Sequence, residues 1–242
     1  MNVLAIDAGN TRIKWGVHDG QHWRRKSWLA TVHAARLKKL LAGMPPPDMI
    51  VIANVAGGAL RERLRRALPE RPAPCWLKST RALCGVKNSY TNPAQLGCDR
   101  WAALIGARRL HAGALVVVNA GTALTVDALT DEGVFVGGLI LPGAELMHRA
   151  LARDTAALGM RRGRFSFFPA STGDAIASGA VNALAGAIER MAHFLAQAGQ
   201  PAPTCVLSGG GAALIAPHLN LEVELVDNLV LEGLVVIAHE AS

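Results

Sequence analysis

Near its start the chain reads Val3-Leu4-Ala5-Ile6-Asp7-Ala8-Gly9-Asn10-Thr11-Arg12-Ile13-Lys14-Trp15-Gly16-Val17. An apolar run ends on the carboxylate Asp7 and turns through Ala8-Gly9-Asn10. It leaves with apolar residues alternating at Ile13, Trp15 and Val17, which is the pattern of a half-buried strand. The stretch therefore predicts a β-hairpin that carries an acid at the tip of its first strand.

Such a hairpin suits a phosphate group. A tight Gly-Asn turn can direct backbone N–H groups and the Thr11 hydroxyl toward one point, and Asp7 beside them could hold a hydrated Mg²⁺ ion. We therefore expect the segment from Asp7 to Lys14 to contact a nucleotide. An ordinary hairpin, in which the aspartate and asparagine only serve the turn, explains this stretch alone equally well.

The pattern recurs at Val116-Val117-Val118-Asn119-Ala120-Gly121-Thr122-Ala123-Leu124-Thr125-Val126-Asp127. Asn119 falls where Asp7 falls in the first hairpin. Two such hairpins, each opening a half of similar length, resemble the actin-like ATPase and sugar-kinase superfold. That resemblance implies an α/β fold of two related, ribonuclease H-like domains that close on a nucleotide, with boundaries at 1–112 and 113–242.

Length and composition fit this organisation. The 242 residues are 51% hydrophobic and 18% charged, which is typical of an ordered globular chain. No apolar run approaches the roughly 20 residues of a membrane span, and no signal-peptide pattern develops. The four cysteines show no C-x-x-C pairing and the histidines no ligand spacing, so neither a zinc site nor a disulfide framework is expected. A cytoplasmic location and no membrane partner are the expectation.

Charge is distributed unevenly along the chain. Residues 1–112 hold 19 Lys and Arg against 6 Asp and Glu, whereas residues 113–242 hold 6 against 12. This asymmetry makes nucleic acid a candidate partner. Much of the excess, however, has the spacing of solvated helix faces, and the 5% aromatic content offers few stacking platforms for single strands. A basic half could equally attract small anions or support contacts between subunits.

A second candidate site lies at Gly97-Cys98-Asp99-Arg100. Asn92-Pro93 predicts the start of a helix that ends near His111, and this motif sits where that helix would kink or restart. Within it, Asp99 could accept a proton from a substrate hydroxyl while Arg100 pairs with an anionic group. The alternative is a local ion pair on a helix surface.

Four motifs in the same order resemble the type III pantothenate kinases over nearly the whole chain. They are Asp7-Ala8-Gly9-Asn10-Thr11, Gly97-Cys98-Asp99-Arg100, Gly121-Thr122-Ala123-Leu124-Thr125-Val126-Asp127 and Gly137-Gly138-Leu139-Ile140-Leu141-Pro142-Gly143. The resemblance implies ATP-dependent phosphorylation of pantothenate to 4'-phosphopantothenate, the first step of coenzyme A biosynthesis.

The resemblance also implies roles for individual residues. Asp99 would be the catalytic base, and Asp7 would organise Mg²⁺ at the phosphates of ATP. The residues implied to contact ATP are Asp7, Ala8, Gly9, Asn10, Thr11, Arg12, Ile13, Lys14 and Thr122. Those implied to contact pantothenate are Tyr90, Gly97, Cys98, Asp99, Arg100 and Thr172, although Ser171 or Thr172 could simply cap a helix. Because the family's pantothenate site borders a dimer interface, a homodimer is expected.

One position departs from the family pattern. The family commonly has Asp at the tip of the second hairpin, where it resembles a ligand of a monovalent cation, and this chain has Asn119. An amide oxygen can still coordinate K⁺ or NH₄⁺, but it lacks the negative charge. Two other classes of function remain open: a kinase of another small hydroxyl or carboxyl acceptor, and a transcriptional accessory or nucleic-acid-binding regulator that retains the fold.

Overall fold

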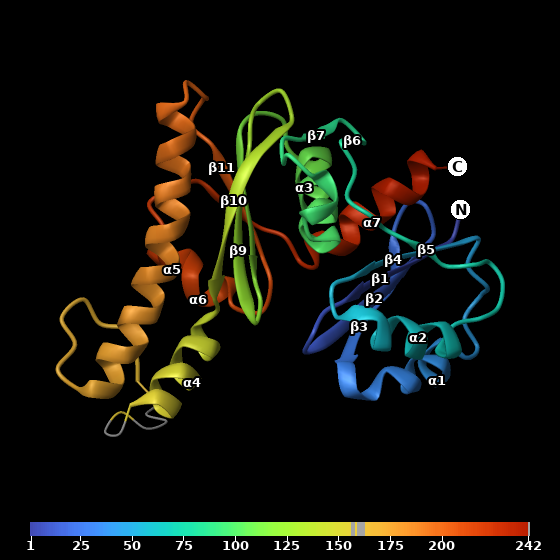
Figure 1. The fold of residues 1–242 in the computed structure, drawn as a ribbon, viewed down its shortest axis with the longest axis horizontal. Helices are drawn as coiled ribbons and strands as arrows, with labels where there is room; N and C mark the ends of the chain where they lie inside the picture. Colours follow the sequence, from blue (N-terminus) through green and yellow to red (C-terminus); the bar gives the residue numbers. More distant parts are fainter. Residues whose placement is uncertain (156–157, 159–162, 242) are drawn as a thin grey trace. The chain divides into compact units, whose positions relative to one another are not determined.

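A computed structural model describes residues 1–155, 158 and 163–241. Contacts within the chain divide it into two compact units. The first consists of Met1–His111 together with Asn228–Ser242, and the second of Ala112–Asp227 (Figure 1). Both units combine a β-sheet with helices, as the alternation of apolar strands and amphipathic segments predicts.

The first unit is built on the sheet that contains the predicted hairpin. Its elements in chain order are β1 (Val3–Ala8), β2 (Arg12–His18), β3 (Trp23–Ala30), the 3₁₀ helix η1 (Thr31–Arg36), α1 (Leu37–Leu41), β4 (Met49–Asn54), α2 (Gly57–Ala67), β5 (Cys75–Trp76), β6 (Ala82–Leu83), β7 (Val86–Asn88), the 3₁₀ helix η2 (Pro93–Gln95), α3 (Cys98–Leu110) and α7 (Leu229–Glu240).

The strand order of this sheet is β3-β2-β1-β4-β5. β1 pairs antiparallel with β2, and on its other side pairs parallel with β4, where Ala8 lies opposite Asn54. Because β1 and β4 are parallel, their carboxyl ends meet at one edge, which is where α/β sheets bind ligands. The parallel pairing therefore sets the loops after Ala8 and Asn54 side by side.

Alternation along β1 sends its side chains to two different environments. Leu4, Ile6 and Ala8 belong to a buried cluster that also includes residues of α1 and α2, among them Leu37 and Leu60. Figure 1 shows α1 and α2 on one side of this sheet and α3 and α7 on the other. Asp7 has the opposite parity from Leu4, Ile6 and Ala8, so its carboxylate lies on the face that α3 and α7 cover.

The C-terminal helix α7 crosses α3 at close range. A Cβ built on Gly233 of α7 would overlap the carbonyl oxygen of Ala102 in α3, and one on Gly106 of α3 would lie 2.8 Å from the Leu229 carbonyl oxygen. The Trp23 indole nitrogen also donates to Glu232 at 2.8 Å. These contacts join the last helix to the first unit, so the structural division differs from the expected boundary of 113–242 at its C-terminal end.

The second unit repeats the strand connectivity of the first. Its elements are β8 (Leu115–Ala120), β9 (Ala123–Leu129), β10 (Val134–Pro142), α4 (Ala144–Asp154), α5 (Thr172–Gln197), β11 (Thr204–Ser208), α6 (Ala212–Ile215), the 3₁₀ helix η3 (Ala216–His218) and β12 (Val223–Leu225).

Its strands run in the order β12-β11-β8-β9-β10. β8, β9 and β10 are antiparallel neighbours, and β11 is parallel to β8 and to β12. The sequence β10-β9-β8-β11-β12 therefore matches β3-β2-β1-β4-β5 strand for strand. The long helix α5 packs its Leu184, Ile188 and Leu195 side chains into the core that covers this sheet. Two units with one topology are what the repeated hairpin predicts.

One predicted helix is shorter than expected. The segment expected to start a helix at Asn92-Pro93 forms only the 3₁₀ turn η2, because the chain is extended at Leu96 and Gly97 before α3 begins at Cys98. Asn92 caps that short turn by accepting a hydrogen bond from the Ala94 N–H. The consequence is that Asp99 lies in the first turn of α3, rather than in the middle of a longer helix.

None of the helices within residues 1–155 and 163–241 combines the length and the apolar character that crossing a bilayer requires.

Replacing Gly233 with alanine should destabilise the protein, because the added methyl group overlaps the Ala102 backbone and helix backbones cannot move apart locally. Overpacking of this kind costs about 1–3 kcal/mol, measurable as a lower urea midpoint. Gly58→Ala in α2 is the matched control, since the space around its Cβ is open; it should leave the midpoint unchanged or raise it slightly. Equal stability of Gly233→Ala and the wild type would contradict the close crossing.

Candidate active site

The Asp7 carboxylate of the first hairpin has a strongly raised pKa. Its side chain is buried at the carboxyl end of β1 and lies across the strand pair from Lys14. Burial raises the pKa of Asp7 to about 7; the Lys14 ammonium partly opposes this shift, and the negative charge of Asp99 adds to it. The acid predicted at a strand tip therefore sits within electrostatic range of the acid predicted on the helix.

The turn after Asp7 is held by hydrogen bonds from both sides. The Gly9 N–H donates to the Arg12 carbonyl at 3.0 Å and closes the turn. Thr31, the residue after β3, donates its hydroxyl to the Gly9 carbonyl at 2.8 Å and its N–H to the Thr11 carbonyl at 3.0 Å. Asn10, Thr11 and Arg12 remain exposed, so the turn presents its tip to solvent while its base is fixed.

The second predicted motif forms the first turn of α3. Burial raises the pKa of Asp99, and the Arg100 N–H, which donates to its Oδ1 at 2.8 Å, together with the Arg100 charge, opposes the rise. A Cβ on Gly97 would come within 2.6 Å of that same oxygen, so only glycine leaves the carboxylate its present position. The Cys98 thiol accepts a backbone hydrogen bond from Asn54, which ties the start of α3 to the end of β4.

Arg100, the residue after Asp99, lies beside Tyr90. The Arg100 guanidinium is almost fully buried, and its Nη1 lies 3.5 Å from the Tyr90 hydroxyl. The Tyr90 N–H donates to Asn88 Oδ1 at 3.0 Å, and Arg81 Nη1 donates to the Tyr90 carbonyl at 2.9 Å. A buried cation and a phenol held this way can bind a small anion. The sequence did not single out Arg81 or Asn88, because side chains that bond to the backbone of a loop leave no local pattern in the sequence.

The donor set around Asp7 fits Mg²⁺ bound mainly by phosphate and water. Within the described ranges no group of three or more His, Cys, Asp and Glu side chains could hold a metal by itself. Mg²⁺ in kinases usually takes only one or two carboxylates and keeps several waters. A divalent ion beside Asp7 would also offset the repulsion from Asp99 that helps to raise the Asp7 pKa.

The second hairpin places Asn119 and Thr122 as the first places Asp7 and Asn10. Asn119 is the penultimate residue of β8 and lies opposite Thr125. A Cβ on Gly209, which has a φ of +101°, would lie 2.8 Å from Asn119 Oδ1 and would meet the Ala120 carbonyl. Thr122 is exposed in the turn, and its carbonyl accepts the Gly143 N–H at 2.9 Å. Gly143 ends the predicted Gly-Gly-x-Ile-x-Pro-Gly motif and so supports this hairpin.

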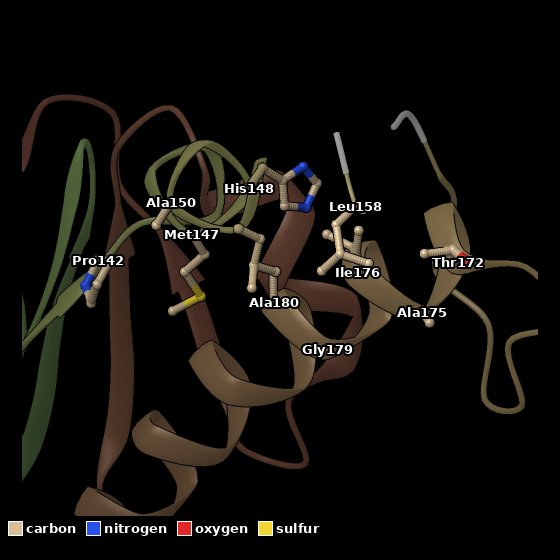
Figure 2. Close-up of a pocket in the computed structure, with 11 residues that line it drawn as sticks. Pro142, Met147, His148, Ala150, Leu158, Thr172, Ala175, Ile176, Gly179 and Ala180 are labelled. Atoms are coloured by element: carbon tan, nitrogen blue, oxygen red, sulfur yellow. The ribbon is translucent and has the colours of Figure 1, made fainter. Parts of the chain in front are cut away.

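Thr172 opens α5 and lines a pocket of about 620 Å³. Ser171 is the helix cap, since its hydroxyl accepts the Asp174 N–H at 3.1 Å, so the capping alternative holds for Ser171 and leaves Thr172 available. Figure 2 shows Thr172 at the opposite end of the pocket from Pro142. The lining residues are Pro142, Met147, His148, Ala150, Leu151, Leu158, Thr172, Ala175, Ile176, Gly179 and Ala180.

Within the first unit, the predicted residues gather at one edge of the sheet. Asp7, at the base of the hairpin, lies within electrostatic range of Cys98 and Asp99, and Arg100 lies beside Tyr90. Asn119, Thr122 and Thr172 belong to the second unit. The residue that sequence reasoning missed at the hairpin is Thr31; a threonine that follows an edge strand gives no signal until β3 is known to return beside the turn.

One protein family matches most of the chain. The family model for type III pantothenate kinase matches residues 3–193. A type III pantothenate kinase of Nitrosospira multiformis is 48% identical over 241 residues, which cover 99% of this chain and 92% of the relative.

Solved structures resemble this chain at the level of the fold. A protein from Campylobacter jejuni described as a Baf family transcriptional activator has a TM-score of 0.62 and 20% identity, with 98% of each chain covered. One from Sinorhizobium meliloti described as a 2-dehydro-3-deoxygalactonokinase has a TM-score of 0.62 and 17% identity, with 99% of each chain covered. The fold is thus that of the actin-like ATPases and sugar kinases, with two α/β domains. The match to the family model and the 48% identity to a full-length relative show that the chain belongs to the type III pantothenate kinase family.

Proposed function

We propose that this kinase transfers the γ-phosphoryl group of ATP to the primary hydroxyl of pantothenate. The product is 4'-phosphopantothenate, and the reaction opens coenzyme A biosynthesis. The observation that carries this proposal is 48% identity to a type III pantothenate kinase over 99% of the chain. A cytoplasmic location accords with it, since Cys75, Cys84, Cys98 and Cys205 are all free thiols and cytoplasmic proteins keep their cysteines reduced.

Asp99 is assigned as the general base. The hydroxyl oxygen of pantothenate forms the new bond to the γ-phosphorus, the bond to the β,γ-bridging oxygen breaks, and the hydroxyl proton passes to the Asp99 carboxylate. A carboxylate whose pKa is raised by burial is a better proton acceptor near neutral pH than an exposed one. Gly97 keeps the space beside that oxygen clear, and Cys98 fixes the backbone through Asn54.

Arg100 and Tyr90 are assigned to the carboxylate end of pantothenate. The guanidinium is buried and lies near the phenol, so a bound carboxylate would meet a cation that has already lost most of its water. Such desolvated pairs are stronger than surface pairs. Thr172 is assigned a further contact with pantothenate by its place in the family motif.

The first hairpin is assigned to the phosphates of ATP. Phosphoryl transfer requires mainly positioning and charge neutralisation, and the exposed turn offers both through backbone N–H groups and cationic side chains. The residues assigned are Ala8, Gly9, Asn10, Thr11, Arg12, Ile13 and Lys14, with Thr122 from the second hairpin. Asp7 would hold Mg²⁺, which neutralises phosphate charge when bound.

A monovalent cation at Asn119 would be weakly held. The Asn119 amide oxygen near Gly209 can coordinate K⁺ or NH₄⁺, but it brings no charge to offset the cost of dehydrating the ion. We therefore propose at most a modest stimulation of the kinase by K⁺ or NH₄⁺.

A homodimer is proposed from the exposed apolar side chains of the second unit. Phe167 is 85% exposed and Phe168 is 92% exposed, and Leu146 and Leu151 of α4 are also exposed. Large apolar side chains exposed at a surface often mark an interaction site, and Leu151 also lines the pocket beside Thr172.

The kinase assignment predicts that Asp99→Asn lowers turnover by about 10²–10⁴-fold, because an amide cannot accept the hydroxyl proton. The measurement is coupled ADP release with MgATP and pantothenate. Asp48→Asn is the matched control, since Asp48 is exposed and its carboxylate accepts the Asn2 N–H; it should keep wild-type turnover. Near-normal turnover in Asp99→Asn would refute the base assignment.

Additional arms of that assay test the acceptor and the cation. Glucose or acetate in place of pantothenate should give no ADP, and adding K⁺ or NH₄⁺ should change the pantothenate-dependent rate little. A folded wild-type protein that shows no pantothenate-dependent turnover in any of these salts would overturn the proposed function, and a strict requirement for one salt would overturn the weak-cation proposal.

The raised pKa of Asp7 predicts that the ligand-free protein loses stability as the pH rises from about 4 to about 7. In that window the unfolded chain has released the Asp7 proton and the folded protein still binds it, so each pH unit costs up to about 1.4 kcal/mol of unfolding free energy. Urea unfolding at several pH values measures this slope. Asp7→Asn should flatten it; an identical slope in the variant would show that Asp7 does not titrate there.

The homodimer proposal predicts a mass of twice the 25.4 kDa chain by light scattering. Phe168→Ser should lower the dimer's stability because it removes an apolar side chain from the interface. A monomer mass that does not change with protein concentration would remove the proposal.

A further inference from the structure

Thr31 contacts the phosphate hairpin from outside its sequence. The residue follows β3, is 7% exposed and begins the 3₁₀ helix η1. Its hydroxyl donates to the Gly9 carbonyl at 2.8 Å, and its N–H donates to the Thr11 carbonyl at 3.0 Å. One buried residue therefore holds two carbonyl groups of a turn whose residues Asn10 and Thr11 are exposed.

Because of the geometry of the peptide bond, these contacts fix the direction of the Asn10 N–H. In a trans peptide the C=O and the following N–H point in opposite directions. Because the Gly9 carbonyl points to Thr31, the Asn10 N–H points away from Thr31, toward the exposed side of the turn. Without this bond the Gly9–Asn10 peptide could rotate, and its carbonyl oxygen would then face an incoming anion that it repels.

We propose that Thr31 is a positioning residue for the phosphates of ATP, acting through the Gly9–Asn10 peptide rather than by touching the nucleotide. The inference rests on the proposed function in one respect, namely that the first hairpin binds ATP. It gives β3 a role in the reaction, since the strand returns Thr31 to the base of the turn. The pantothenate residues Tyr90 and Arg100 make none of these contacts.

Thr31→Val tests the proposal, since valine keeps the shape and removes the hydroxyl. Loss of one hydrogen bond to this partly buried carbonyl corresponds to an effect of up to about tenfold, so we expect the KM for ATP to rise by up to about tenfold while the KM for pantothenate stays unchanged. Thr31→Ser restores a hydroxyl and should recover the KM for ATP. Thr130→Val is the matched control: Thr130 is also buried and its hydroxyl accepts the Val134 N–H at 3.2 Å, in the second unit.

A binding measurement separates this proposal from the assigned reaction. MgATP is titrated without pantothenate and followed by tryptophan fluorescence, because Trp28 stacks on Arg12 with 4.4 Å between the guanidinium carbon and the ring centre. A tenfold weaker affinity in Thr31→Val, restored in Thr31→Ser, supports the positioning role even if the acceptor is not pantothenate. Unchanged ATP affinity in a Thr31→Val protein with a native melting curve would overturn it, as would an equal loss in Thr130→Val.

Discussion

The burial of the Asp7 carboxylate is the constraint on which the candidate site depends. A buried acid beside a second acid is unfavourable in its ionised form, and the raised pKa of Asp7 expresses that cost. Lys14, directly across the hairpin, offsets only part of it. The arrangement therefore favours a cation or a cation–phosphate complex at this point, since positive charge relieves the repulsion between Asp7 and Asp99. The free energy that the burial of two neighbouring acids costs is partly regained when such a ligand binds.

The geometry around Asp7 follows from the parallel pairing of β1 with β4. That pairing brings the ends of both strands to one edge, and the Asn54 backbone then holds Cys98 and the first turn of α3. The two acids thus come from elements far apart in sequence but fixed to the same pair of strands. The second unit has the same strand connectivity with the amide Asn119 at the matching position. Of these two matching positions, Asp7 carries a carboxylate and Asn119 does not, so the symmetry of the topology does not extend to the charge.

Sequence patterns predicted what local periodicity controls. The alternation at Ile13, Trp15 and Val17 gave the first hairpin, and its repeat gave the second unit. A kink or restart was expected at Gly97 to Arg100, but the sequence did not predict that Asn92-Pro93 opens only a 3₁₀ turn. A capping residue such as Asn92 specifies where a turn starts and not how far it continues. The packing of α7 against the first unit was also not predicted. In the sequence Gly106 and Gly233 are only weak helix formers, and their small size matters only where the two helices cross. Thr31 escaped notice for the same reason, as its bonds join residues 20 or more positions apart.

If the hairpin binds phosphate and residues beside α3 bind the acceptor, one fold can serve different reactions. The neighbours of known structure share this topology at 17–20% identity, and a strand-tip turn that orients backbone N–H groups can bind phosphate whatever the acceptor is. Choice of acceptor then falls to side chains outside the hairpins. For this chain we propose that Arg100 and Tyr90 make that choice; Arg100 is buried, and Asn88 and Arg81 bond to the backbone of Tyr90. A cation placed this way favours a carboxylate-bearing alcohol over a neutral sugar, because only the carboxylate gains an ion pair with the guanidinium.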